Sequence, residues 1–281
     1  MTASAAVLVL FYEKPEQTLD CLASFLPSGA PLHVLNNGSS REATRRVAAF
    51  AAKHPSIHLW TSDRNLGVSG GRNELIRRSA EEWLFFVDND AVVTAAGWRD
   101  RLAAHAAGNP DAEAFVPSIY NVHAKSAEKW GDVVIKDGVL TQIAKPAPET
   151  NIFGGTAIVR RSLFDRLGLF DDAMFVGFED LEIAVRAIRA GAPIRARHAD
   201  DITLVHDHRR ARTLGDRRAV EDRYRKDEIR HSYEHLVTKY GLVWDHQWER
   251  WITAERGRML GGAVARGLAA LRTFVARQLS R

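Results

Sequence analysis

Cysteine is nearly absent from this chain, since Cys21 is its one cysteine among 281 residues. A single thiol excludes an internal disulfide framework and fits a reducing compartment. Long hydrophobic runs are missing too, and no stretch approaches the roughly 18 apolar residues typical of a membrane span. The apolar run at residues 5–11 has no basic segment before it and meets Glu13 and Lys14 at once. It predicts a strand rather than a signal peptide, and the chain is expected to be cytoplasmic.

Strong charge of either sign is also absent, because 39 basic and 35 acidic residues leave a net charge of +4. That balance favours anionic ligands without requiring nucleic acid, and we expect no nucleic-acid partner. Hydrophobic residues make up 46% and charged residues 26%, which is typical of a globular protein. The length suits one α/β domain with an appendage.

Strands and helices alternate along the first part of the sequence. Short apolar strands are expected at 6–11, 32–35, 57–61 and 83–87, and helices at 15–25, 41–52, about 73–79 and 97–107. This alternation predicts an α/β fold with a doubly wound, mostly parallel sheet. Later elements are a hairpin at 133–143, strands at 151–159 and 202–205, and helices at 162–167 and 181–190. An arginine-rich mobile loop is expected at 209–218, and a helix from there to residue 240.

The apolar run at 83–87 ends abruptly in Asp88-Asn89-Asp90. A continuous apolar run indicates a central strand buried on both faces, and ligands of open α/β sheets bind at the carboxyl ends of such strands. Asp88 and Asp90 are therefore candidates for holding a divalent cation beside substrate phosphates. The alternative is that these residues simply form the turn after the strand, because Asn and Asp favour turns.

Glycines cluster at Gly67, Gly70 and Gly71, ahead of the helix that reaches residue 79. Glycines before a helix N-terminus let the backbone approach an anion closely. The spacing is neither that of a Walker loop nor that of a dinucleotide fingerprint. A second pair, Gly154 and Gly155, is expected inside a strand, where a ligand or another backbone would come close.

Glu179 and Asp180 open a helix after two aromatic residues and a glycine. Acids at a helix start can simply complement the helix dipole. In a partly apolar pocket, however, a carboxylate can be tuned to act as a base. His206 ends the last predicted strand and is a candidate metal ligand, although a solvated loop histidine or a role for His208 instead are alternatives.

Together these motifs resemble the family-2 inverting glycosyltransferases of the glycosyltransferase A fold. The likeness covers about residues 7–208. It rests on Asn37-Gly38-Ser39, Asn65-Leu66-Gly67, Arg72-Asn73, Asp88-Asn89-Asp90, Gly154-Gly155, Arg160-Arg161, Phe170-Asp171 and Gly177-Phe178-Glu179-Asp180. The resemblance implies a nucleoside-diphosphate sugar donor, a divalent metal (Mn²⁺ or Mg²⁺), and inverting transfer to a hydroxyl acceptor in glycan or glycolipid biosynthesis.

The resemblance also assigns roles to single residues. Asp180, with Glu179 as the alternative, would be the catalytic base, and Asp90, Asp88 and His206 would contact the metal. The donor site would comprise Phe11, Tyr12, Asn36, Asn65, Gly67, Arg72, Asp88, Gly154 and Gly155. Asn36 departs from the aspartate usual at its position, which leaves the nucleobase open. The sugar and the acceptor stay open as well.

Two other classes remain alternatives. A nucleotidyltransferase would carry a glycine-rich loop after the first strand, and residues 11–14 contain no glycine. A catalytically silent nucleotide-sugar-binding protein is the other alternative. The lack of any stretch long and apolar enough to span a membrane argues against a processive polysaccharide synthase and for the addition of one or a few sugars.

The chain is expected to divide into a catalytic domain, 1–208, and a C-terminal helical extension, 209–281. Between Arg256 and Arg281 there are six arginines and no acid, with apolar residues near helical spacing. This pattern predicts a helix that packs on the domain or lies on an anionic membrane surface. The enzyme would then work at the inner face of the membrane.

Overall fold

The structure is a computed structural model that describes residues 4–122, 124–128, 131–143, 148–207 and 209–260. Its first part alternates strands and helices as predicted. The elements are β1 (Ala5–Phe11), α1 (Pro15–Phe25), β2 (Leu32–Asn37), α2 (Arg41–Ala51), β3 (Ile57–Ser62), α3 (Gly67–Arg78) and β4 (Trp83–Asp88). The four strands pair in parallel in the order β4-β1-β2-β3, with Val7 opposite Leu32 and Phe85.

The second part extends the same sheet on the other side of β4. Its elements are β5 (Ala91–Val93), α4 (Trp98–Gly108), β6 (Ala114–Asn121), β7 (Ser126–Ala127), β8 (Asp132–Lys136), β9 (Val139–Ile143), β10 (Glu149–Thr150), β11 (Ala157–Arg160), α5 (Arg161–Leu167), α6 (Glu179–Arg189) and β12 (Ala196–His206). The main path is β10-β12-β6-β11-β4-β1-β2-β3. Because β11 runs antiparallel between β4 and β6, the sheet is mixed although mostly parallel.

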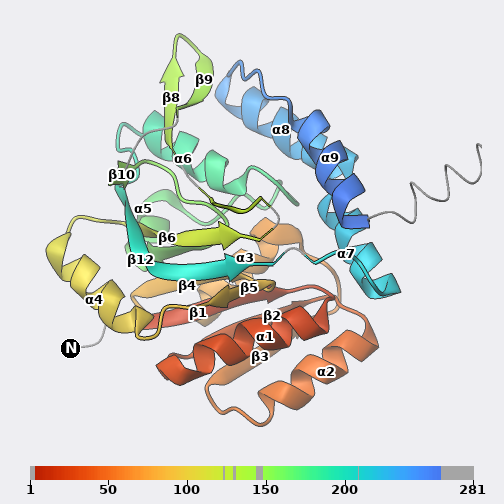
Figure 1. Cartoon of the computed structure of the whole chain (residues 1–281). Coiled ribbons are helices and arrows are strands. Elements are labelled where there is room, and N and C mark those ends of the chain that lie inside the picture. The colour runs from red at the N-terminus through yellow and green to blue at the C-terminus, as the bar shows by residue number, and fades with distance from the viewer. Residues whose placement is uncertain (1–3, 123, 129–130, 144–147, 208, 261–281) are drawn as a thin grey trace, which may run out of the picture.

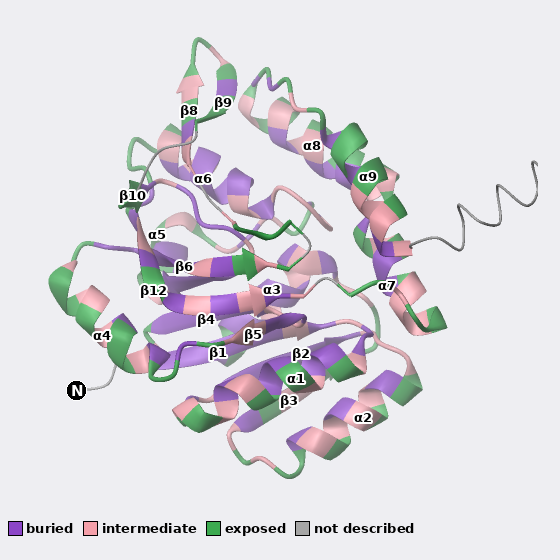
Figure 2. Cartoon of the chain, in the orientation of Figure 1, coloured by how far each residue is buried: buried purple, intermediate pink, exposed green. Residues whose placement is uncertain are grey.

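Helices cover both faces of this sheet (Figure 1). On one face, α1, α2 and α4 pack on the alternate strand residues Val7, Val9 and Phe85. On the other face, α3, α5 and α6 pack on Leu8, Phe86 and their neighbours. Figure 2 shows the strands buried between these layers, with exposed residues on the outer faces of the helices. The architecture confirms the predicted α/β fold.

The hairpin of β8 and β9 confirms the prediction around Asp137-Gly138, where both residues have positive φ. Other local predictions were wrong. Gly70 and Gly71 lie inside α3, whose first residue is Gly67, and Gly154-Gly155 precede β11 rather than lying within a strand. The sequence pattern also missed β6 and the first half of β12.

Three helices follow the sheet: α7 (Leu214–Arg223), α8 (Lys226–Tyr240) and α9 (Trp248–Leu260). The prediction of a loop over the whole of 209–218 is wrong, because residues 214–218 belong to α7. Buried side chains from α7, α8 and α9 form a separate apolar cluster, which comprises Val220, Tyr224, Ile229, Trp248, Ile252 and Met259.

Among the described residues, no helix is long and apolar enough to span a bilayer. The predicted membrane-facing helix falls mainly on 261–281, which lies outside the described residues.

Candidate functional site

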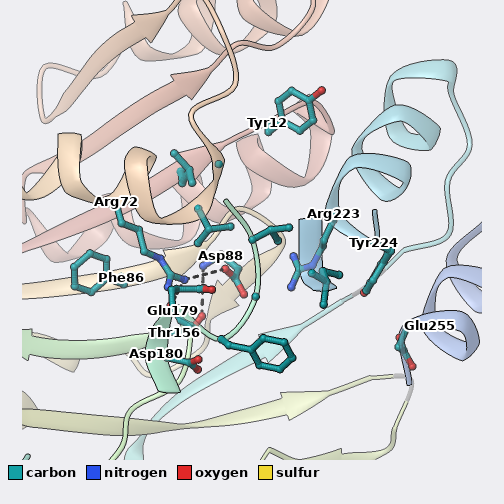
Figure 3. Close-up of a pocket in the computed structure, with 18 of the residues that line it drawn as sticks. Tyr12, Arg72, Phe86, Asp88, Thr156, Glu179, Asp180, Arg223, Tyr224 and Glu255 are labelled. Atoms are coloured by element: carbon teal, nitrogen blue, oxygen red, sulfur yellow. Dashed lines mark hydrogen bonds and ion pairs between the residues drawn. The ribbon is translucent and has the colours of Figure 1, made fainter. Parts of the chain in front are cut away.

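A cavity of about 800 Å³ opens at the carboxyl ends of β1 and β4. Its walls come from the loop after β1, from α3, from the start of α6, and from α7 and α9. Figure 3 shows its side chains converging from the sheet on one side and from the C-terminal helices on the other. The cavity thus occupies the edge of the sheet where the sequence placed a ligand site.

Two carboxylates and an imidazole meet on the sheet side of this cavity. The Nε2 atom of His206 lies 2.8 Å from Oδ1 of Asp90 and 3.8 Å from Oδ2 of Asp88. The ligand atoms of the three residues all lie within 4.8 Å of one another. Carboxylate oxygens and an imidazole nitrogen form a donor set that fits Mn²⁺ or Mg²⁺. Strand pairing explains the meeting, because His206 of β12 is paired with Ala91, next to Asp90.

Internal cations neutralise these carboxylates in the structure. Lys14 Nζ lies 3.3 Å from Oδ2 of Asp90, and both side chains are buried. Burial opposes the charge of His206, but Asp90, Glu128 and Asp88 together raise its pKa to about 10. Burial alone would raise the pKa of Asp88, yet Arg223, His206 and Arg72 hold it below its usual range. A metal ion bound here would replace the proton on the imidazole.

Arg72 joins the two ends of the cavity from its position in α3. Its Nη2 donates to the carbonyl oxygen of Gly155 at 2.8 Å, and its Nη1 donates to Oε1 of Glu179 at 3.2 Å. The same guanidinium lies 3.9 Å from Asp88 and stacks over Phe86. The two hydrogen bonds fix the relative position of Gly155 and Glu179. Arg72 also lines the cavity, and its role in binding the nucleotide-sugar donor stays a prediction.

Glu179 and Asp180 begin α6 at the far side of the cavity, and both line it. Glu179 is held by Arg72, while its Oε2 atom is buried without a hydrogen-bond partner among the described residues. Burial, followed by the charge of Glu179, raises the pKa of Asp180 to about 7. A carboxyl group that titrates near neutrality can take up a proton from a substrate hydroxyl.

An aromatic cluster fixes the start of α6. Phe178 precedes Glu179 and has φ of 66°, a left-handed conformation that is strained for a bulky residue. Its ring packs edge-to-face on Trp244 at 5.2 Å and on His246 at 5.9 Å. Residues after α8 therefore hold the backbone that presents Asp180, a role that sequence reasoning did not find.

Helix α7 also reaches the part of the cavity next to the loop after β1. The hydroxyl of Tyr12 donates to Asp222, a contact that joins residues 210 positions apart. Arg223 and Tyr224 follow and line the cavity. Sequence reasoning missed them because the segment has no apolar stripe. Thr213 and Asp216 form a capping box at the start of α7, and that Thr-x-x-Asp spacing was the available signal.

Most of the predicted residues line the cavity. They are Tyr12, Asn65, Gly67, Arg72, Asp88, Gly155, Glu179, Asp180 and His206. Asp90 lies just behind its surface, 2% exposed, against His206 and Lys14. Gly154 is buried beside Gly155 but is not part of the lining.

Phe11 and Asn36 are not brought to the cavity. Phe11 is fully buried in the core between β1 and the helices of one face. Asn36 donates from Nδ2 to Thr44 and accepts from the backbone N–H of Ser39, so both ends of its amide are occupied. Its neighbour Asn37 lines the cavity instead and hydrogen-bonds Asn65. The alternation of side chains along β2 thus turns Asn36 away from the cavity and Asn37 toward it.

Residues 6–168 match the model of the family described as glycosyl transferase family 2. This match spans more than half of the chain, which therefore belongs to that family. The low-salt glycan biosynthesis hexosyltransferase Agl10 of Haloferax volcanii is 25% identical over 203 residues. The aligned region covers 67% of this chain and 63% of Agl10, so the chain spans less than two thirds of that relative.

Solved structures share the fold at low sequence identity. The structure of GalNAc-T7 with UDP, GalNAc and Mn²⁺ matches 76% of this chain and 44% of its own, with TM-score 0.58 and 17% identity. The mannosyltransferase PcManGT of Pyrobaculum calidifontis, with GDP-Man and Mn²⁺, matches 98% of this chain and 81% of its own, with TM-score 0.55 and 18% identity. The fold is accordingly that of the glycosyltransferase A class.

Proposed function

We propose that this chain is a metal-dependent, inverting and non-processive glycosyltransferase that uses a nucleoside-diphosphate sugar. One observation carries the proposal: a single cavity holds the Asp88–Asp90–His206 group on one wall and Asp180, with a pKa near 7, on another. The first arrangement suits a metal-bound diphosphate and the second suits a general base. The family membership supports the same proposal, as do the structures of GalNAc-T7 with UDP, GalNAc and Mn²⁺ and of PcManGT with GDP-Man and Mn²⁺.

Asp88, Asp90 and His206 would hold the divalent ion, Mn²⁺ or Mg²⁺. When bound, the ion offsets negative charge on the diphosphate leaving group. Lys14 lies 3.3 Å from Oδ2 of Asp90 and would hold this carboxylate in position. Tyr12, Asn65 and Gly67 line the part of the cavity next to the ends of β1 and β2, where the nucleoside would lie.

Asp180 takes the proton from the acceptor hydroxyl. The acceptor oxygen then forms a bond to the anomeric carbon while the bond from that carbon to the diphosphate oxygen breaks, and the electron pair leaves with the nucleoside diphosphate. Attack from the Asp180 side and departure on the metal side place the two oxygens on opposite faces of the sugar, so the configuration inverts. Glu179 is tied to Arg72 and takes a positioning role.

A thermal-shift screen of UDP, GDP and dTDP, each with and without Mn²⁺, tests the donor class. The proposal expects one diphosphate to raise the melting temperature more with the metal than without it. The matching nucleotide sugar should then give a glycoside and a nucleoside diphosphate by mass spectrometry. A nucleotide sugar with pyrophosphate as products would make the protein a nucleotidyltransferase. Binding without turnover on any acceptor would favour a silent binding protein.

The acceptor is proposed to be a glycan, a glycolipid or another hydroxyl compound. We also propose the division into a catalytic part, 1–208, and an extension, 209–281, that touches an anionic membrane peripherally. The described part of the extension contributes Arg223, Trp244 and Trp251 to the cavity. It would therefore complete the site as well as place it near a membrane-bound acceptor.

A further inference from the structure

Arg223 is the last residue of α7, and its side chain lines the cavity opposite the sheet. Figure 3 shows its guanidinium directed toward Asp88. The residue is exposed, and a cation at a helix C-terminus is favoured by the helix dipole. The side chain of Arg223 is thus open to solvent and directed toward the proposed metal ligands.

Arg223 differs in its contacts from the other lysine and arginine side chains that line the cavity. Lys14 pairs with Asp90, Arg72 pairs with Glu179, and Arg258 pairs with Glu255. Arg223 makes no hydrogen bond or ion pair with any residue in the described part of the chain, and its nearest aromatic partner is the ring of Tyr224 at 6.0 Å. Its guanidinium donors are therefore available to a ligand.

The backbone on both sides of Arg223 is anchored. Asp222 accepts a hydrogen bond from Tyr12, which ties the end of α7 to the loop after β1. Tyr224 is 4% exposed and packs in the cluster with Trp248 and Ile252. A guanidinium on a fixed backbone loses less freedom on binding than one on a mobile loop, so the site is preorganised.

We propose that Arg223 binds the diphosphate of the donor from the side that faces Asp88, Asp90 and His206. The inference rests on the proposed function, because it takes the nucleoside diphosphate as the ligand. A planar guanidinium can donate two parallel N–H groups to phosphate oxygens. Transfer leaves an additional negative charge on the diphosphate when its bond to the sugar breaks. Arg223 should therefore bind the released nucleoside diphosphate more strongly than the intact nucleotide sugar.

The test is isothermal titration of the full chain with UDP, GDP and their monophosphates in MnCl2. We expect Arg223→Gln to weaken diphosphate binding roughly ten- to a hundredfold and monophosphate binding much less. Arg223→Lys should recover part of the loss, since it restores the charge without the planar fork. Arg217→Gln is the matched control, because it removes the same charge from the same helix away from the cavity lining.

Three results would overturn the inference. One is wild-type affinity of Arg223→Gln for the diphosphate that the wild-type chain binds. Another is an equal loss of affinity for the diphosphate and the monophosphate. The third is an equal loss of affinity in Arg217→Gln, which would mean a general effect of charge or folding. If the wild-type chain binds no nucleoside diphosphate with Mn²⁺, the proposed function itself fails. Wild-type binding with an unaffected Arg223→Gln removes only the role of Arg223.

Discussion

The side chain of Asp180, the base that we propose, links the pH dependence of the reaction to the stability of the fold. Its pKa is raised to about 7 by burial and by the neighbouring charge of Glu179. The unfolded chain would ionise this group near its ordinary pKa of 3.8. The folded state therefore holds an extra proton between these two values, and its stability falls as the pH rises through this window.

The catalytic consequence is a pH-dependent rate. Because the proposed base, Asp180, could take up a proton only when it is ionised, the transfer rate should rise about tenfold per pH unit below pH 6 and level off above about pH 7. Asp180→Asn removes the titrating base, so it should lower the rate at least about a hundredfold at pH 8 and abolish this pH dependence, with donor affinity kept. Steady-state rates at saturating donor from pH 5 to 9 measure this. If Glu179→Gln is the inactive variant and Asp180→Asn stays active, the roles of the two acids are exchanged.

Substitution of Asp180 should lower the transfer rate but raise the stability of the fold at alkaline pH. Asp180→Asn removes a carboxylate that is costly to ionise, so the variant should melt several degrees above wild type at pH 8. At pH 5 the wild-type carboxyl is protonated and the two melting temperatures should converge. Melting curves at pH 5 and pH 8 test this prediction. A difference in melting temperature that is the same at both pH values would show that the pKa of Asp180 is not raised.

Asp90 requires a conservative substitution. Alanine would leave Lys14 as a buried cation without its carboxylate, at a cost of about 3–5 kcal/mol of stability. Asp90→Asn keeps the shape, and we expect it to abolish the Mn²⁺-dependent part of nucleotide binding while the fold survives. Asp201→Asn, an exposed acid on the same strand as His206, is the control. Retained Mn²⁺ dependence in Asp90→Asn would exclude Asp90 as a ligand.

At the scale of elements, the contact of α7 with the loop after β1 depends on Gly215. A Cβ atom there would lie 2.8 Å from Oε2 of Glu13. This side chain is held in place by Ser40, whose backbone N–H donates to Oε1 and whose hydroxyl donates to Oε2. Gly215→Ala should therefore displace α7 and weaken nucleotide binding about fivefold or more, in line with about 1–3 kcal/mol for overpacking. Nucleotide titration measures this.

Gly257→Ala is the matched control in α9, because a Cβ atom at that position meets open space. It should raise stability by about 0.5–1 kcal/mol through helix propensity and leave nucleotide binding unchanged. Equal nucleotide affinity in the two glycine variants would argue that α7 does not control the donor site.

Elements with continuous apolar runs were predictable, and elements with interrupted patterns were not. The apolar runs of β1 and β4 predicted the parallel strands, and the acids at the end of β4 predicted the edge of the sheet at which Asp88, Asp90 and His206 lie together. In β6, Pro117 argued against a strand, and in β12 the pairing shifts between Ala199 and Thr203, where two aspartates break the alternation. The antiparallel direction of β11 has no sequence signal at all. Long-range contacts such as those of Lys14 and Arg223 depend on this packing.

At the scale of the whole molecule, the C-terminal segment divides into two parts that can be tested separately. In α9, Trp248, Ile252 and Met259 pack with residues of α7 and α8, so the helix belongs to the folded unit. Of the six C-terminal arginines, Arg256 and Arg258 lie in α9 and the other four lie in 261–281. We expect the full chain to float with anionic liposomes, less so as salt rises.

A chain that ends at residue 260 should stay monodisperse and melt near the wild-type temperature but no longer float. A chain that ends at residue 240 should melt lower, because it loses the packing of α9. Flotation assays and melting curves of the three chains distinguish membrane contact by residues 261–281 from stabilisation of the fold by α9. Equal flotation of the full chain and the chain ending at 260 would place any membrane contact elsewhere.

The position of β11 in the sheet has a consequence for synthesis on the ribosome. β4 lies next to β1 on one side, but its other edge is completed only by β11, through pairs such as Leu84 with Val159. Residues 89–156 must be made before that strand exists, which takes several seconds at about 5–20 residues per second. During this interval the nascent chain presents an open, apolar strand edge, a known template for unwanted association. A ribosome-bound chain halted after α4 should therefore recruit holding chaperones, whereas a chain extended past β11 and α5 can close the edge itself.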